Sequence, residues 1–120
     1  NYNRFADAFQ FIKDVPVDWS DSRYLEAEPG RYITVARRDK NSPDWYVGAI
    51  TADEPREAVI NLGFLPKGKY KVTIYEDAPG ADWKDNPQAY RIREVVVKNG
   101  AVLRQPLASG GGAAMRIVKL

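Results

Sequence analysis

The side chains of this 120-residue chain that could perform chemistry are carboxylates, lysines and tyrosines, because the sequence contains neither His nor Cys. Without imidazole and thiol groups, a Ser-His-Asp triad, a thiolate nucleophile, a disulfide and a zinc site with Cys or His ligands are excluded. Carboxylate chemistry of the kind that glycosidases use needs one protonated acid beside one ionised partner. A catalytic site in this chain would therefore require such a pair of carboxyl groups.

Three pairs of acidic residues are close neighbours in the sequence: Glu26 with Glu28, Glu76 with Asp77, and Asp82 with Asp85. All are expected at strand ends or in polar loops, where water keeps both members of a pair ionised. An acid/base pair needs pKa values that burial pushes apart, and no pattern around these residues predicts burial. We interpret them as solvated acids, and no catalytic residue is assigned.

Trp83 lies in a long polar segment, residues 77–89, between Asp82 and Asp85. A Trp ring with polar neighbours suits a sugar-binding platform, so these three residues are candidate ligand-binding residues, with Tyr75 or Tyr90 as further contributors. The alternative is that Trp83 folds back to anchor its own loop, as long loops usually require. Packing is the favoured interpretation, and the sugar site stays open as its rival.

Two other motifs lack the spacing that ligand binding requires. The run 110–112 (Gly-Gly-Gly) is followed by a strand-like apolar segment instead of Lys-Ser/Thr and a helix, so it is not a phosphate loop. Asp77, Asp82 and Asp85 do not follow the calcium-loop pattern. The sequence predicts no metal ligand and no cofactor in this chain.

Charge and hydropathy argue against two classes of partner. The net charge is only +2, and basic residues such as Lys67, Lys69 and Lys71 recur at strand-like spacing, which favours a solvated sheet face over a phosphate-binding patch. No apolar run is long enough to cross a bilayer. We predict neither a nucleic acid nor a membrane as a partner.

The elements that position these residues begin with a helix. Apolar residues recur at helical spacing from Tyr2 to Ile12, including Phe9, which predicts a helix over residues 3–14 that Pro16 ends. Phe11 lies off this apolar stripe, so a second apolar body, such as a neighbouring domain, is expected to cover it.

After the helix the apolar period changes to two, which is typical of strands. Eight short segments are predicted as strands: Arg23–Ala27, Arg31–Arg37, Trp45–Ile50, Ala58–Leu62, Lys69–Glu76, Tyr90–Lys98, Ala101–Leu107 and Ala113–Lys119. Turn residues separate nearly all of them, and Asn99-Gly100 predicts a two-residue type I′ hairpin. The fold class is therefore mainly β, an antiparallel two-layer β-sandwich of about eight short strands preceded by one N-terminal helix.

Four stretches, taken in order, carry a family resemblance: FADAFQFIKDVPVDWSDSRYLEAEPGRYITVARRD, DWYVGAI, FLPKGKYKVTIYEDAPGADWKDNPQAY and ASGGGAAMRIVKL. Together they cover most of the chain and resemble the C-terminal domain of glycoside hydrolase family 97. The resemblance implies a β-sandwich over residues 16–120, with residues 1–15 forming the helical segment that leaves an upstream (β/α)8 catalytic barrel.

The resemblance also implies a function. The parent enzymes are calcium-dependent bacterial α-glucosidases or α-galactosidases acting on α-linked oligosaccharides, commonly periplasmic or secreted, with catalytic and calcium-binding residues outside this domain. The domain is then a non-catalytic accessory unit that packs on the barrel and forms a homo-oligomer. Phe9, Phe11 and Trp19 are the expected interdomain contacts. The rival is an independent carbohydrate-binding module that uses Trp83.

Overall fold

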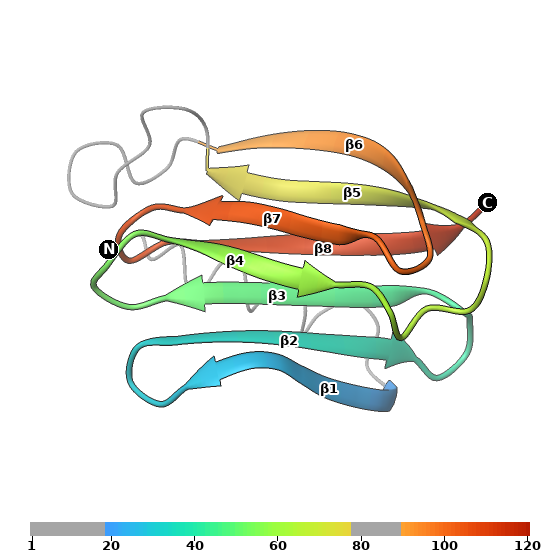
Figure 1. The fold of residues 1–120 in the computed structure, drawn as a ribbon, viewed down its shortest axis with the longest axis horizontal. Helices are drawn as coiled ribbons and strands as arrows, with labels where there is room; N and C mark the ends of the chain where they lie inside the picture. The colour runs from blue at the N-terminus through green and yellow to red at the C-terminus, as the bar shows by residue number, and fades with distance from the viewer. Residues whose placement is uncertain (1–18, 78–89) are drawn as a thin grey trace.

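The computed structural model describes residues 19–77 and 90–120, and these residues form eight antiparallel strands (Figure 1). The strands are β1 (Trp19–Glu28), β2 (Tyr32–Asp39), β3 (Trp45–Thr51), β4 (Arg56–Asn61), β5 (Lys69–Asp77), β6 (Tyr90–Lys98), β7 (Val102–Leu107) and β8 (Gly112–Lys119). The predicted fold class is confirmed, and each predicted strand corresponds to an observed one. The predicted helix over residues 3–14 lies outside the described residues.

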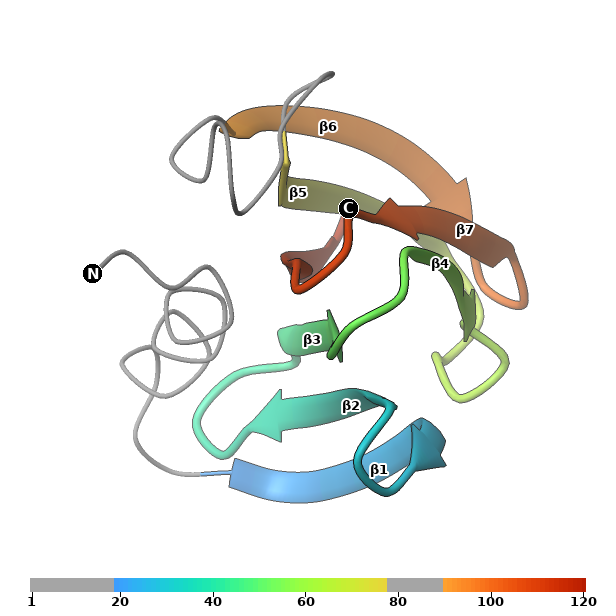
Figure 2. The ribbon, with the colours of Figure 1, turned by 90° about the vertical axis from the view of Figure 1, so that its left-hand side faces the viewer.

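The strands form two sheets of unequal size. The larger sheet has six strands in the order β1-β2-β3-β8-β5-β6, and the smaller sheet pairs β4 with β7. In Figure 1 the small sheet lies over β3 and β8, and Figure 2 shows it on one side of the curved larger sheet. The arrangement is a β-sandwich whose second layer covers the middle of the first.

The core lies between these two layers. On β5 the side chains of Tyr70, Val72 and Ile74 are buried while Lys69 stays exposed, which confirms the predicted alternation. Ile60 of β4 meets this face and is fully buried. Burying each such aliphatic side chain contributes about 1.5–3 kcal/mol to folding, so the contact between the sheets is a main source of stability.

An aromatic contact closes one end of the core. Trp45, the first residue of β3, is only 5% exposed, and the centre of its ring lies 4.5 Å from that of Phe64 at a tilted angle. The guanidinium of Arg23 lies within 6 Å of both rings. Such contacts allow a cation to stabilise the edge of an apolar cluster.

The opposite face of the large sheet is also buried at its centre. Val35, Tyr46 and Ala114 are each at most 3% exposed, although they lie on the face away from the small sheet. On β2, Thr34, Val35 and Ala36 are all buried, so both faces of this strand are covered. The large sheet is therefore a two-sided layer.

The predicted type I′ hairpin at Asn99-Gly100 is wrong. β6 pairs with β5 and β7 pairs with β4, so this turn carries the chain from one sheet to the other. Gly100 has a φ of 83°, whereas no described residue other than glycine has a positive φ, which excludes the conformation that type I′ demands of Asn99. Asn99 instead caps the neighbouring turn, because its Oδ1 accepts a hydrogen bond from the backbone N–H of Gly68 at 3.1 Å.

Candidate functional site

A buried carboxylate on β5 is the most constrained polar group among the described residues. Glu76 is 4% exposed, and its Oε2 accepts hydrogen bonds from Nε of Arg91 at 2.6 Å and Nε of Arg93 at 2.7 Å. Its Oε1 accepts a bond from Nε2 of Gln105 at 2.8 Å. Because Gln105 lies on β7, the cluster connects the two sheets.

The pKa of Glu76 decides what this cluster can do. Burial by itself raises the pKa of the carboxyl, but hydrogen bonds from Arg93, Gln105 and Arg91 outweigh burial and hold the pKa below its ordinary value. A general acid needs the reverse, a raised pKa that keeps the proton at neutral pH. Glu76 is thus a structural anion at neutral pH and not a proton donor.

The prediction that Glu76 is a solvated acid is therefore wrong, because its side chain is buried. Hairpin pairing places Arg91 directly opposite Glu76, and Arg93 is two residues along the same face. The alternation of Arg91 and Arg93 on a strand that follows an acidic strand end was the available signal. Gln105 gave no such signal, because its contact depends on how the two sheets stack.

A second ion pair ties the edge of the large sheet to the small sheet. Glu26 of β1 accepts a hydrogen bond from Nη2 of Arg56 on β4 at 3.2 Å, and its other oxygen accepts one from the backbone N–H of Val59 at 3.1 Å. The Arg56 guanidinium also lies 3.5 Å from the centre of the Tyr32 ring. Both charges are half-buried and both are used in structural contacts.

The acidic pair Glu26 and Glu28 does not form an acid/base site. Glu28 is exposed and pairs with Arg31 at 2.9 Å, a hydrogen bond that lowers the pKa of its carboxyl. Glu26 is bound to Arg56 as described. Each carboxylate is ion-paired with an arginine of its own, whereas the two-carboxylate mechanism requires two carboxyl groups that face one substrate.

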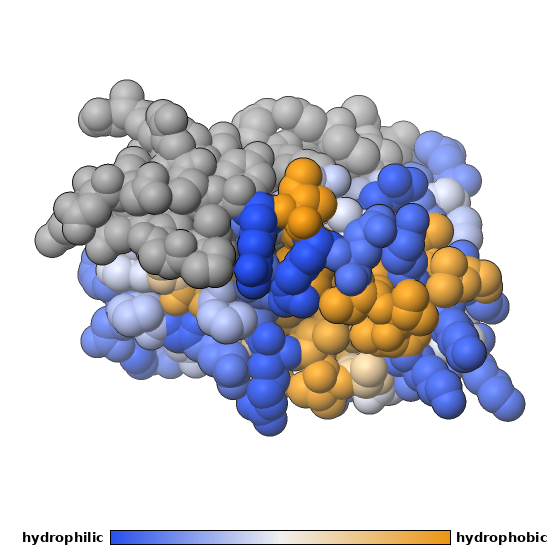
Figure 3. Space-filling model, turned by 90° about the horizontal axis from the view of Figure 1, so that it is seen from above, coloured by the Kyte–Doolittle hydropathy of each residue, from blue (hydrophilic) through white to orange (hydrophobic). Residues whose placement is uncertain are grey.

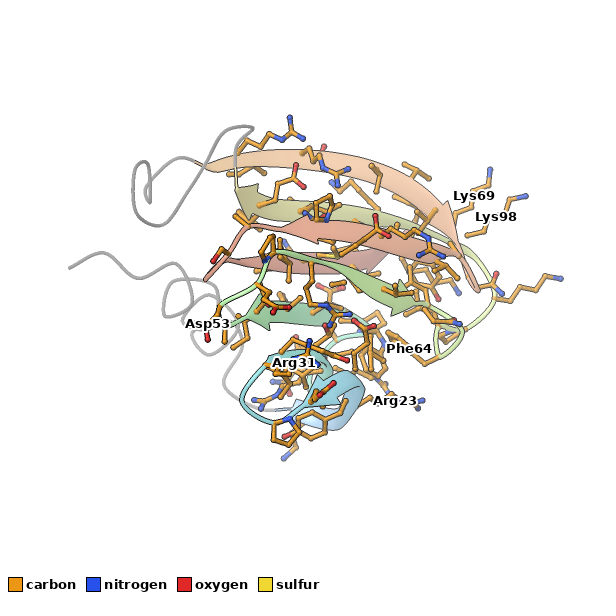
Figure 4. The ribbon with its side chains drawn as sticks, turned by 60° about the vertical axis from the view of Figure 1, so that its left-hand side comes forward. Arg23, Arg31, Asp53, Phe64, Lys69 and Lys98 are labelled. Atoms are coloured by element: carbon orange, nitrogen blue, oxygen red, sulfur yellow. The ribbon has the colours of Figure 1, made fainter. Side chains whose placement is uncertain are left out.

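A pocket opens beside these residues at the end of the sandwich that carries the β1–β2 and β3–β4 turns. Its volume is about 310 Å³, and its lining is Gly30, Arg31, Tyr32, Thr51, Ala52, Asp53, Glu54 and Arg56. Figure 4 shows Arg31 and Asp53 on these two turns. The lining is polar, but both of its arginines are already ion-paired. Arg31 lies 3.7 Å from Glu54, and Arg56 is bound to Glu26.

Most of the site residues that the sequence predicts lie outside the described residues. Trp83, Asp82 and Asp85, the candidate sugar-binding residues, lie outside the described residues, as do Phe9 and Phe11.

Three further candidates fall within the described strands. Trp19 is the first residue of β1. Tyr75 is half-buried and packs against Tyr46 and Ala114 on the outer face of the large sheet. Tyr90 is the first residue of β6. The described residues thus do not bring a sugar-binding set together.

The described part of the chain contains neither a metal-binding cluster nor a membrane-spanning helix. Within residues 19–77 and 90–120, no three acidic side chains gather in a way that could hold a metal ion. The oxygens of Glu76 and Glu26, the two most enclosed glutamates, are already bound by protein donors. No helix in the described part is long and apolar enough to span a membrane.

A match to a family model identifies the family of this chain. A family model described as glycosyl-hydrolase 97 C-terminal, oligomerisation, matches residues 18–118. The chain belongs to this family. The match covers the eight described strands except for Lys119 at the end of β8, so the glycoside hydrolase family 97 C-terminal domain and the observed fold are the same unit.

Relatives of known name support this assignment. A retaining alpha-galactosidase of Bacteroides thetaiotaomicron is 32% identical over 117 residues, which is 98% of this chain and 17% of the relative. A glycoside hydrolase family 97 enzyme of Pseudoalteromonas sp. strain K8, solved with panose and with acarbose, is 42% identical with a TM-score of 0.82. This chain covers 18% of that enzyme. A beta-arabinopyranosidase is 25% identical, with a TM-score of 0.66.

This chain corresponds to only a small part of each relative. The family 97 C-terminal domain described here spans less than one fifth of the relatives that it matches. It is an accessory part of such enzymes and not their catalytic part.

Proposed function

We propose that this chain is the non-catalytic C-terminal accessory domain of an α-glycoside hydrolase, an α-glucosidase or α-galactosidase whose catalytic carboxylates lie in an upstream (β/α)8 barrel. One observation carries the proposal: the chain matches over 98% of its own length but only 17% of a retaining alpha-galactosidase. The ion pairs of Glu26, Glu28 and Glu76 agree with it, because each of these carboxylates is bound by arginine in a structural contact.

The substrate and the metal belong to the proposed parent enzyme. The substrate is an α-linked oligosaccharide, a choice supported by the relatives solved with panose and acarbose. Calcium is proposed as a cofactor of the parent enzyme, and this part of the proposal rests on the family resemblance alone. A periplasmic or secreted location belongs to the same proposal and rests on the family resemblance alone.

The proposed partners are the barrel of the same polypeptide and further copies of the chain. Phe9, Phe11 and Trp19 are proposed to contact the barrel, because the helix predicted around the two phenylalanines has aromatic residues on more than one side. Homo-oligomer formation is supported by the family description, which names oligomerisation.

The catalytic claim is tested by assaying the purified 120-residue chain. Aryl α-glucosides and α-galactosides are incubated with the chain in the presence of calcium, and release of the aryl group is followed over hours. We expect no turnover above the rate without protein. Turnover that disappears in Glu76→Gln but persists in Glu57→Gln would overturn the proposal, because Glu57 is an exposed glutamate on the small sheet.

The rival sugar-binding function is tested by calorimetric titration with maltooligosaccharides and galactosides. We expect no saturable heat. Saturable heat that is lost in Trp83→Ala, with the β-sheet circular dichroism retained, would instead establish a carbohydrate-binding module.

A further inference from the structure

One edge of the large sheet is built for strand pairing. β6 has nine residues, pairs with β5 in unbroken register over its whole length, and is the last strand in its sheet. An edge strand presents unpaired N–H and C=O groups and invites pairing with another chain. Regular edges of this length are usually blocked unless they are used.

The other edges of the described sheets are obstructed. On β4, the backbone N–H of Val59 already donates a hydrogen bond to Glu26 of β1. The register of β1, the opposite edge strand, shifts between Trp19 and Asp21 and again between Tyr24 and Glu26. Irregularities of this kind bend and twist an edge away from a partner. In the small sheet, β7 contains Pro106, which cannot donate a backbone hydrogen bond. β6 has neither a register shift nor a proline.

Three of the charged side chains of β6 are held in ion pairs with β5. Arg91 and Arg93 are both bound to Glu76 on the inner face. On the outer face, Nζ of Lys71 lies 3.5 Å from a carboxylate oxygen of Glu94. Charged side chains on an edge prevent pairing when they are left uncompensated; each of these three takes part in an ion pair within its own chain, and one carboxylate serves both arginines.

Large apolar side chains lie exposed on the same strand. Ile92 is 60% exposed and Val96 is 62% exposed, and both lie on the outer face on either side of Glu94. Figure 3 looks onto the β6 side of the molecule and shows an apolar area bordered by hydrophilic residues. Apolar side chains in such a position favour burial against a partner.

We propose that β6 pairs antiparallel with β6 of a second copy of this chain, about a two-fold axis at Glu94. This register places Ile92 opposite Val96 of the second copy, and Val96 opposite its Ile92, so that four exposed apolar side chains pack together. Cross-strand aliphatic pairs of this kind stabilise antiparallel pairing. The two Glu94 side chains meet at the axis, each beside its own Lys71.

The pairing joins the two large sheets into one continuous sheet and leaves the small sheets apart. A two-fold interface of this type is closed, so it yields a dimer and not a filament. The inference rests on the proposed oligomerisation and goes beyond it by naming the strand, the register and the symmetry.

The register is tested by a single cysteine, which is informative because the chain has no cysteine of its own. Glu94→Cys places two thiols directly opposite each other at the axis, where Cβ atoms are about 4.5–5.5 Å apart. Mild oxidation, or a short bis-maleimide, should convert most of the chain to a covalent dimer on a non-reducing gel. Glu57→Cys, on the exposed face of β4, is the matched control and should remain monomeric.

The apolar contact is tested by sedimentation velocity over a concentration series. Val96→Lys should weaken the dimer about tenfold or more, because the substitution occurs twice about the axis and replaces two aliphatic pairs. Tyr24→Lys, at a residue 66% exposed on the opposite edge strand, should leave the association constant unchanged. Circular dichroism confirms that both variants are folded.

The outcomes separate the surface from the oligomerisation itself. A dimer that persists in Val96→Lys, with Glu94→Cys cross-linking no better than Glu57→Cys, would show that oligomerisation occurs through another surface. A chain that sediments as a monomer at every concentration would overturn both this inference and the proposed self-association. Neither result alters the hydrolysis assay, which tests the non-catalytic role independently.

Discussion

Gln105 of β7 donates a hydrogen bond of 2.8 Å to the carboxylate of Glu76 on β5, and this contact links the two layers of the sandwich through a buried negative charge. Two arginines of β6 bind the same carboxylate. Three strands from two sheets therefore meet at one side chain.

Removing the Glu76 carboxylate should destabilise the fold. Glu76→Ala leaves Gln105 and two arginines without their common partner, and breaking a buried pair in this way costs several kcal/mol. Because Arg91 and Arg93 are half-exposed and can turn toward water, we expect a loss near the lower end, about 3 kcal/mol, in the free energy of unfolding in urea.

The control for this experiment is Glu57→Ala. Glu57 pairs with Arg104 at 3.3 Å with both side chains exposed, and exposed pairs contribute no more than about 1 kcal/mol. Equal losses in the two variants would contradict a special role for the buried carboxylate.

The same carboxylate predicts acid sensitivity. Its pKa is lower in the folded chain than in the unfolded chain, so the unfolded chain binds more protons as the pH falls below 4.5, the ordinary pKa of glutamic acid. The contribution of Glu76 to stability is complete above that pH and is lost as the pH falls through the lowered pKa. Urea unfolding from pH 7 to pH 2 measures this loss.

Glu76→Gln should flatten the pH dependence below pH 4.5, because the variant has no carboxyl to protonate at this position. Glu28→Gln, at an exposed residue whose pKa is also lowered, is the comparison and should change the curve less. A larger effect of Glu28→Gln would place the acid sensitivity at the surface.

The turn between the two sheets depends on Gly100. Its φ of 83° lies in the left-handed region, so Gly100→Ala should cost about 1 kcal/mol even though an added Cβ meets nothing within 4 Å. Lys98→Ala, in the preceding strand, is the control and should change the unfolding midpoint very little. Unchanged stability in Gly100→Ala would mean that the turn relaxes to another conformation.

Arg56 should not tolerate replacement by lysine. Its guanidinium binds Glu26 and also lies over the Tyr32 ring, and a single ammonium cannot fill both positions in the same geometry. We expect Arg56→Lys to lose about 1 kcal/mol of unfolding free energy. Arg104→Lys, in the exposed pair with Glu57, is the matched control, and a loss as large there would remove the argument for the ring contact.

Local patterns were sufficient to predict the strands. Alternation along β5 predicted which of Tyr70 and Lys69 is buried, because the side-chain period of a strand depends only on the strand itself. The ordered motifs also led to the correct family, which the match over residues 18–118 confirms. Properties that depend on neighbours in sequence were thus accessible without coordinates.

Properties that depend on distant neighbours were not accessible. Asn99-Gly100 has the composition of a hairpin turn, but its type follows from the sheets that β6 and β7 join, which no local pattern records. The sequence does not predict the burial of Glu76, because Gln105, the partner that helps to bury it, is 29 residues away and in the other sheet. The pocket beside Tyr32 and Arg56 likewise depends on how two turns meet.

The position of β8 has a consequence for how the chain folds during synthesis. β8 is the last of the eight strands to leave the ribosome, yet it lies between β3 and β5 and forms both of their central ladders. The strands β1 to β3 and the hairpin of β5 and β6 must therefore wait as separate pieces, each with unpaired edges, until β8 joins them. Folding of this domain should complete only after translation of the last strand, and a nascent chain stalled before Gly112 should be readily digested by protease.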